Sequence, residues 1–233
     1  MPARPPAPAR RRRDSAHCGP VPEVQAIVDA VSRRLPPQWA QWGGGWPDQI
    51  EAALIDAVLS IRNRYGKKPT SGVRGAVQRY QNDRSGETLD DLNALAAYDT
   101  AQLQAILTNR QKTGGVPKSA AIITAASALT AAGVHTARDL DPDSLVHRRA
   151  YCNVHGLGPV TWTYFTMLLG QPGVKADTWI IRFVTDALSS PHPVPSKQAE
   201  ALVTAAAEQL EVSPTALDHA IWRHLSTTAR MRQ

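Results

Sequence analysis

A single carboxylate stands at the start of an apolar segment in this chain. Asp177 precedes TWIIRFV, where the apolar pattern predicts a helix over 178–188. An aspartate in this place can cap the helix by accepting a hydrogen bond from a backbone amide. It can also act as a base that orients or deprotonates a water molecule, and a helix start favours the ionised form that such chemistry needs.

A glycine turn lies further upstream, between two predicted helices at 143–153 and 159–169. The turn is His155-Gly156-Leu157-Gly158, and Pro159 suits the first position of the second helix. Glycine is needed where φ is positive or where another group approaches the main chain closely. Residues 143–169 therefore predict a helix–hairpin–helix whose turn amides, beside a helix N-terminus, can bind a DNA phosphate. A plain helical corner explains the same residues equally well.

Hydrophobic periodicity predicts helices along nearly the whole chain. Apolar residues recur every three or four positions, and no stretch alternates convincingly with period two. We therefore predict an all-α protein of about eleven helices joined by short loops. The predicted helices cover 22–35, 48–65, 72–82, 88–97, 100–109, 116–133, 143–153, 159–169, 178–188, 196–210 and 213–228.

The segment between the first two helices carries three tryptophans, Trp39, Trp42 and Trp46, around the glycines 43–45. We interpret it mainly as a packed connector between two lobes. Stacking of an indole on a nucleobase is the alternative.

Charge is concentrated at the N-terminus. The chain has a net charge of +6, but residues 1–20 carry five arginines against Asp14, and the rest has 21 basic against 19 acidic residues. This Pro-, Ala- and Arg-rich tail predicts disorder. Either it has no further role, or it contacts phosphates without sequence preference and adds salt-sensitive affinity. Because the body is nearly neutral, any nucleic-acid site in it must be local.

Composition argues against several classes. Cys18 and Cys152 are far apart in sequence, so we expect neither a disulfide scaffold nor a zinc site. No apolar run approaches the roughly 18 residues of a membrane span, and no apolar stretch follows the N-terminal arginines as in a secretory signal. We expect a cytoplasmic protein, associated with the nucleoid if bacterial, without a membrane partner and without a cofactor.

The motifs GLGPVT and VKADTWIIRF resemble those of the helix–hairpin–helix DNA glycosylases of the endonuclease III type. The signature of that superfamily (HhH-GPD) is a Leu-Pro-Gly-Val-Gly hairpin, a helix, and then Val-Asp-Thr-His followed shortly by Arg. The resemblance covers roughly 47–190 and is strong only over 154–184. It implies two helical lobes with a DNA-binding cleft between them. One lobe would be 47–171, and the other would combine 21–46 with 172–233.

The resemblance also implies roles for individual residues. Asp177 falls on the catalytic acid. Arg62 ends the helix that presents a polar residue toward the flipped-out base, and Trp179 replaces the usual histidine and either packs or shapes the base pocket. The DNA-binding positions implied are His155, Gly156, Leu157, Gly158, Thr161, Lys118 and Arg182.

The chemistry implied is release of a base from DNA. Breaking the glycosidic bond gives the deoxyribose oxocarbenium character, which a carboxylate aimed at C1′ stabilises while it orients a water molecule. The base must first leave the stack, because its bond is otherwise shielded.

Three departures from the family refine the prediction. Bifunctional members carry a nucleophilic lysine where this chain has Val160, so a lyase step through that position is excluded. Lys175 matches no family nucleophile, and we interpret it as a solvated loop residue. No cysteine follows Cys152, so we expect no iron–sulfur cluster.

We therefore expect a monomeric, monofunctional DNA glycosylase acting on double-stranded DNA and leaving an abasic site. The divergence of its motifs motivates the hypothesis of a non-standard substrate, such as an alkylated, oxidised or hypermodified base, including those of phage DNA, with a role in repair or anti-phage defence. The alternative is a non-catalytic helix–hairpin–helix DNA-binding protein. Asp56 and Asp186 are expected on the surface, although Asp56 is also a candidate second carboxylate of the cleft.

Overall fold

The computed structural model describes residues 22–39, 42, 45–63 and 70–231, and it is mostly helical. Both the N-terminal tail of residues 1–20 and the predicted end of the second helix at Tyr65 lie outside the described residues. The helices are α1 (Pro22–Arg34), α2 (Ile50–Leu59), α3 (Gly72–Asp83), α4 (Leu92–Ala96), α5 (Thr100–Leu107), α6 (Lys118–Ala131), α7 (Leu145–Cys152), α8 (Pro159–Leu168), α9 (Thr178–Ala187), α10 (Ser196–Gln209) and α11 (Pro214–Met231). Within the described residues no helix is both long and apolar enough to span a membrane.

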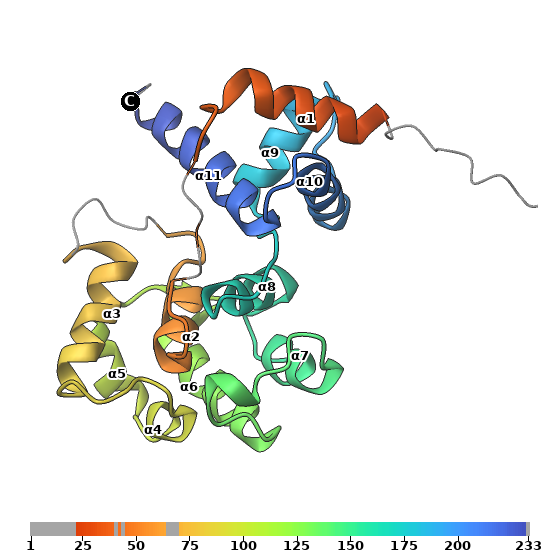
Figure 1. The fold of residues 1–233 in the computed structure, drawn as a ribbon. Coiled ribbons are helices and arrows are strands. Elements are labelled where there is room, and N and C mark those ends of the chain that lie inside the picture. The colour runs from red at the N-terminus through yellow and green to blue at the C-terminus, as the bar shows by residue number, and fades with distance from the viewer. Residues whose placement is uncertain (1–21, 40–41, 43–44, 64–69, 232–233) are drawn as a thin grey trace, which may run out of the picture.

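The buried apolar side chains form two separate groups. The central cluster is formed by buried side chains from Ile50 to Leu168, on the segment that begins with α2 and ends with α8. The terminal cluster combines Ile27–Leu35 of the N-terminal region with Val174–Ile221. Figure 1 shows the same grouping, with α1, α9, α10 and α11 on one side and α2 to α8 on the other.

Helix α2 lies at the centre of the central cluster. All ten of its residues are buried, whereas its sequence suggested a stripe on one side. The two acids on it are therefore interior groups. Glu51 accepts hydrogen bonds from the Tyr80 hydroxyl and, at 3.0 Å, from the Asp91 amide, and Arg84 lies 3.6 Å away. These partners satisfy a carboxylate that would otherwise be costly to bury.

Lys118 explains why α2 ends at Leu59. Its side chain is 1% exposed, and Nζ donates to the carbonyls of Leu59 at 2.9 Å and Ile61 at 2.6 Å and to Gln111 Oε1 at 2.8 Å. The last carbonyls of a helix lack partners within it, and a cation there also interacts favourably with the helix dipole. The predicted contact of Lys118 with DNA is therefore wrong, because its ammonium is used in the interior.

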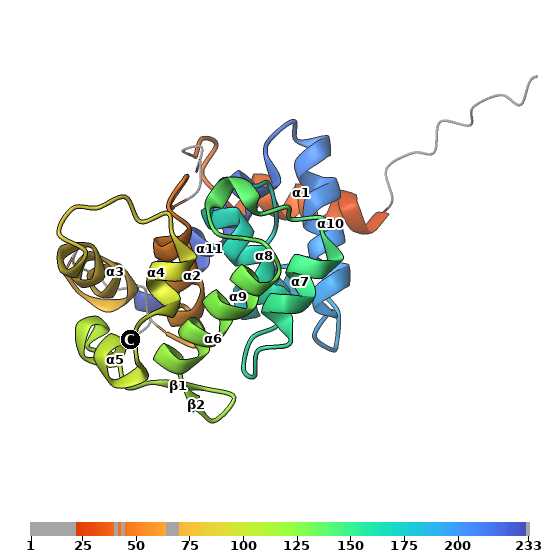
Figure 2. The ribbon, with the colours of Figure 1, turned by 90° about the horizontal axis from the view of Figure 1, so that it is seen from below.

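The turn between α7 and α8 packs against a small hairpin that the sequence did not predict. Strands β1 (Lys112–Thr113) and β2 (Val116–Pro117) pair antiparallel, and the hairpin lies at the edge of the central helices in Figure 2. Gly156 has φ of +86°, and its carbonyl accepts a hydrogen bond from Thr113 Oγ1 at 2.6 Å. A Cβ on Gly156 would lie 2.6 Å from the Thr113 carbonyl oxygen. Gly156 is therefore required by both its conformation and its neighbour.

We expect Gly156→Ala to destabilise the fold by roughly 3 kcal/mol, since it combines left-handed strain with overpacking. The matched control is Gly133→Ala, which has φ of +88° but no neighbour within 4 Å of the added Cβ. That control should cost only the strain, about 1 kcal/mol. Chemical denaturation of the three proteins measures both values, and equal losses would contradict the contact with Thr113.

Candidate functional site: a pocket between the two core clusters

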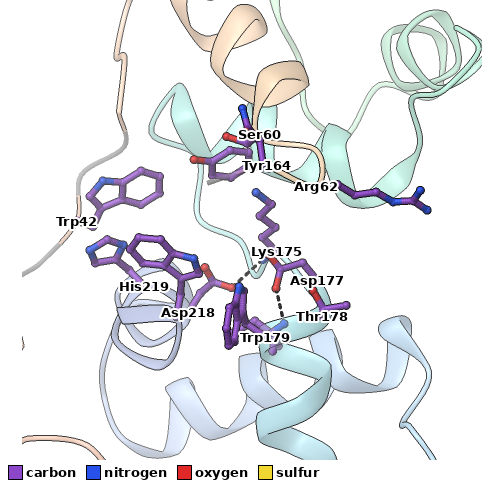
Figure 3. Close-up of a pocket in the computed structure, with 13 residues that line it drawn as sticks. Trp42, Ser60, Arg62, Tyr164, Lys175, Asp177, Thr178, Trp179, Asp218 and His219 are labelled. Carbon is purple, nitrogen blue, oxygen red and sulfur yellow. Dashed lines mark hydrogen bonds between the residues drawn. The ribbon is translucent and has the colours of Figure 1, made fainter. Parts of the chain in front are cut away.

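A pocket of about 350 Å³ lies between the two clusters. Ser60, Arg62, Asn63 and Tyr164 line it from the side of the central cluster, together with Trp42 of the preceding connector. The other side is formed by Lys175 and Asp177 before α9, by Thr178, Trp179 and Ile180 in its first turn, and by Asp218, His219 and Trp222 of α11. Figure 3 shows these side chains around one opening. The volume is near the lower end of the roughly 300–1,000 Å³ of small-molecule sites.

An extended segment before α9 supplies the charged residues of the pocket. Val174 and Ala176 are buried in the terminal cluster, while Lys175 and Asp177 line the pocket. This alternation is what an extended backbone imposes, because successive side chains point to opposite sides. Two polar side chains of α11 fix the segment: the Gly173 amide donates to Thr215 Oγ1 at 2.9 Å, and the Lys175 amide donates to Asp218 Oδ1 at 3.0 Å.

Asp177 is both the N-cap of α9 and a pocket residue. Its Oδ1 accepts a hydrogen bond from the Trp179 amide at 2.8 Å. The side chain is partly exposed and lies on the pocket side of the segment (Figure 3). The capping bond occupies one carboxylate oxygen and sets the orientation of the group. Capping and chemistry are therefore compatible at this position.

Lys175 is not the solvated loop residue that its sequence context suggested. Its Nζ lies 3.4 Å from the centre of the Tyr164 ring, inside the pocket (Figure 3). Burial lowers the pKa of Lys175, while the carboxylates of Asp177, Asp56 and Asp218 oppose this shift. The alternation of Val174 to Asp177 is the sequence signal that could have placed Lys175 beside the acid.

Asp218 is a second carboxyl group of the pocket and was not identified from sequence. It is 8% exposed, on α11. Burial and the neighbouring charge of Asp177 raise its pKa well above the usual range, against the effects of Lys175. Two carboxyl groups in one pocket are a common arrangement for acid–base chemistry.

Asp56 lies behind Tyr164, which lines the pocket, and is fully buried, so its expected surface position is wrong. Oδ2 accepts from the Trp46 indole at 2.9 Å, and Oδ1 accepts from Ser60 Oγ at 3.0 Å and the Tyr164 hydroxyl at 3.4 Å. These bonds hold Tyr164, on whose ring the Lys175 ammonium lies. Asp56 therefore positions a wall of the pocket. The expected surface position of Asp186 is consistent with a side chain that is 51% exposed.

Three aromatic rings stack along one side of the pocket. The rings of Trp42 and His219 lie 5.6 Å apart and nearly parallel, and His219 stacks on Trp222 at 5.5 Å. Burial, and to a smaller extent the charge of Arg223, lowers the pKa of His219. Trp42 thus belongs to a pocket wall, while Trp46 anchors the connector through Asp56. Nothing in the local sequence indicates that α11 would bring His219 to the connector.

The glycine turn offers fewer amide donors than its sequence suggested. The Leu157 amide donates to the Val154 carbonyl at 3.0 Å, and the Gly158 amide donates to Thr161 Oγ1 at 3.0 Å. The Thr161 hydroxyl in turn donates to the Gly158 carbonyl at 2.8 Å. The remaining donors are the Gly156 amide and the amides of Val160 and Thr161 in the first turn of α8, since Pro159 has no N–H and the Trp162 amide donates to the Gly158 carbonyl.

Of the other predicted site residues, some line the pocket and some lie outside it. Arg62 is exposed at the rim, with φ of +50°, and Figure 3 shows its guanidinium directed away from the pocket centre. Trp179 is partly buried and lines the pocket. Arg182 is 60% exposed and lies 4.0 Å from Asp186 on the same helix. His155 is exposed beside Gly114, and Leu157 packs on the central cluster.

The structure brings together Asp177, Trp179 and the rim residue Arg62 in one pocket. It adds Lys175 and Asp218, which local sequence patterns did not identify. Within the described residues no group of three His, Cys, Asp or Glu side chains is arranged to hold a metal ion.

Asp218→Asn should stabilise the protein. The amide oxygen can still accept the bond from the Lys175 amide, and the cost of a buried charge is removed. The pKa of Asp218 is raised in the folded state, so the free energy of unfolding of the wild type falls as pH rises above about 4, the pKa of an unfolded aspartate. The variant has no such loss, because asparagine does not titrate. The melting temperature should exceed that of the wild type by roughly 2–4 °C at pH 8, the effect of about 1 kcal/mol in a chain of this size. The gain should be smaller at pH 5, and a lower melting temperature at both pH values would contradict the assignment.

No curated protein and no solved structure gives a significant match to this chain. One family model, described as a domain of unknown function (DUF8548), matches residues 25–226. The matched region includes both core clusters and every pocket residue named above. The chain therefore belongs to the DUF8548 family.

Proposed function

We propose that this protein is a DNA glycosylase that flips a damaged or modified base out of double-stranded DNA and hydrolyses its N-glycosidic bond. The observation that carries the proposal is the position of Asp177, a carboxylate at a helix start that lines a pocket. The two core clusters then correspond to the two lobes of an HhH-GPD fold, with the pocket in the DNA-binding cleft between them. The protein acts as a monomer.

The pocket suits a flipped nucleobase in size and in lining. A base is flat and aromatic, and each added stacking partner contributes roughly 1–3 kcal/mol of binding free energy. Trp42 and Trp222, which stack on the two faces of His219, can supply such surfaces. Ser60 and Asn63 add polar groups to the lining, where a base edge can form hydrogen bonds. This combination is unlike a phosphate-binding groove, which would carry mostly cations.

Asp177 supplies the chemistry of bond cleavage. As the bond stretches, positive charge develops on the sugar, and an ionised carboxylate held in a fixed position beside it stabilises that charge. The bond from the Trp179 amide holds the Asp177 carboxylate in this orientation. A water molecule oriented by the same carboxylate completes the hydrolysis. Asp218, whose pKa is raised, can donate a proton to the departing base.

In this proposal the glycine turn binds a phosphate of the DNA strand. Gly158 has open space around its α-carbon, and the first turn of α8 presents amides beside it. Tyr164 of the pocket follows Pro159 by five residues, about 7–8 Å along the helix axis. At 3.4 Å of rise per nucleotide in a strand, that separation corresponds to about two nucleotides. A phosphate held at the turn is therefore compatible with a base entering the pocket.

A non-catalytic DNA-binding protein is the second candidate, and one observation favours it. The Asp177 carboxylate already caps α9, so an aspartate would be useful there without any catalysis. In that case the lowered pKa of Lys175 and the raised pKa of Asp218 would be unexplained costs of folding. Shifted pKa values gathered in one pocket are more typical of enzymes.

Asp177→Asn should abolish base release while leaving DNA affinity unchanged or higher, because asparagine can still cap the helix but carries no charge. We expect a loss of about a hundredfold or more in rate, the usual range for a positioned acid–base group. Free bases released from oligonucleotides with single modified bases, and from genomic and phage DNAs, are measured by mass spectrometry. The matched control is Asp186→Asn on the exposed face of the same helix.

Retention of base release in the Asp177→Asn protein would exclude the mechanism. Binding of DNA by the wild type without release of any base from these substrates would favour the non-catalytic alternative. Activity limited to uracil or mispaired adenine would contradict the expected non-standard substrate.

Gly158→Val should weaken binding to every DNA sequence, because the side chain would occupy the space where the strand backbone approaches the turn. No protein atom lies within 4 Å of an added Cβ, and φ is −171°, so the fold should tolerate the change. We expect affinity to fall by about tenfold, the effect of roughly 1.4 kcal/mol. Fluorescence anisotropy with two unrelated duplexes measures it, and a melting temperature equal to that of the wild type is the control. Unchanged affinity would mean that DNA does not contact the turn.

A further inference from the structure

The position of Lys175 suggests a second reaction on the product of the first. We propose that Lys175 Nζ attacks C1′ of an abasic sugar held in the pocket and forms an imine that leads to cleavage of the DNA strand. The proposal rests on the proposed function, since it assumes that the pocket accepts a deoxyribose. It replaces the expectation of a purely monofunctional enzyme, which was based on Val160.

Geometry provides the first argument. Lys175 and Asp177 lie two residues apart on an extended segment, on the same side of it, and both line the pocket. A group that reaches Asp177 is therefore also within reach of the flexible lysine side chain. The Gly173 and Lys175 amides donate hydrogen bonds to two side chains of α11 and hold the backbone at the base of this lysine in place.

The surroundings of the amine provide the second argument. Nζ lies over the face of Tyr164, and Asp56, fully buried behind that ring, holds its hydroxyl. A lysine that serves to bind phosphates would extend to the surface, as Lys197 does on α10. Burial lowers the pKa of Lys175, which increases the share of neutral amine that can act as a nucleophile.

The reaction balances without an oxidant or a reductant. The amine lone pair forms a bond to C1′ of the ring-opened aldehyde, and the carbonyl oxygen leaves as water after taking two protons, one of them from the amine. The protonated imine then acidifies C2′–H. Asp177 takes that proton, the C3′–O3′ bond breaks, and the downstream strand leaves with a 5′-phosphate. Water finally hydrolyses the imine and returns the free lysine.

Borohydride trapping on preformed abasic DNA tests the proposal. Hydride adds to the imine carbon and leaves a stable secondary amine, so protein and DNA remain joined on a denaturing gel. The substrate is a duplex with a single abasic site, which removes any need to know the base that the enzyme excises. We expect an adduct with the wild-type protein, and peptide mass spectrometry should locate it on Lys175.

Three variants test whether Lys175 acts as a nucleophile or only contributes a positive charge. Lys175→Arg keeps the positive charge and Lys175→Gln removes it, and both should reduce the adduct to the level of the reaction without enzyme. Lys197→Gln removes an exposed lysine on α10 and should leave the adduct unchanged. Thermal melting of each variant confirms that it folds. Strand cleavage in the absence of borohydride should follow the same order.

An adduct located on another amine, or its persistence in the Lys175→Arg protein, would overturn the proposal. A wild-type protein that releases bases and binds the abasic duplex but yields no adduct would also overturn it, and the glycosylase proposal would stand. An adduct on Lys175 without release of any base would support the imine and leave the glycosylase proposal without support.

Discussion

The hydrogen bond from the Lys175 amide to the Asp218 carboxyl group is the contact on which the site depends. It attaches the segment before α9 to α11 and fixes which of its side chains face the terminal cluster and which face the pocket. A shift of one residue along this segment would bury Lys175 and Asp177 and expose Val174 and Ala176. Burial of apolar side chains on one side therefore sets the position of the charges on the other.

The same contact has an energetic cost. A carboxyl group that is 8% exposed, close to Asp177, holds its proton more tightly than in water, and burial disfavours the charge on Lys175. Neither effect helps the chain to fold. Functional sites often retain such costs because the reaction needs the altered proton affinities. In this protein two large aliphatic and aromatic clusters supply the stability that offsets them.

Local sequence patterns were sufficient for the helices. The expected and observed starts agree for α1, α3, α5, α8, α9 and α10, because caps, prolines and glycines act within a few residues. They failed for α2, whose end is set by Lys118 from far along the chain. The one-sided pattern of α2 was also misleading, since Glu51 and Asp56 are buried with partners that are distant in sequence.

For the site, the position of Asp177 at a helix start could be predicted, because capping is local. The partners that make it a site could not. Asp218 and His219 reach the pocket only through the packing of α11, and Trp42 reaches it from the connector before α2. Lys175 is an intermediate case. Its alternation with buried neighbours is visible in sequence, but four residues are too few to distinguish an extended segment from a loop.

The chain passes between the two clusters twice, once before α2 and once after α8, and these passages are joined. The Trp46 amide donates to the Leu168 carbonyl at 2.8 Å, at the edge of the central cluster. Two tethers linked at one point resist sliding and twisting of the halves but permit bending about that point. Trp46 also binds Asp56, which lies behind Tyr164, so the point of bending would lie next to this side of the pocket. Bending there would widen or narrow the pocket. The mouth would thus move most where a strand must enter, while the groups around Asp56 keep their spacing.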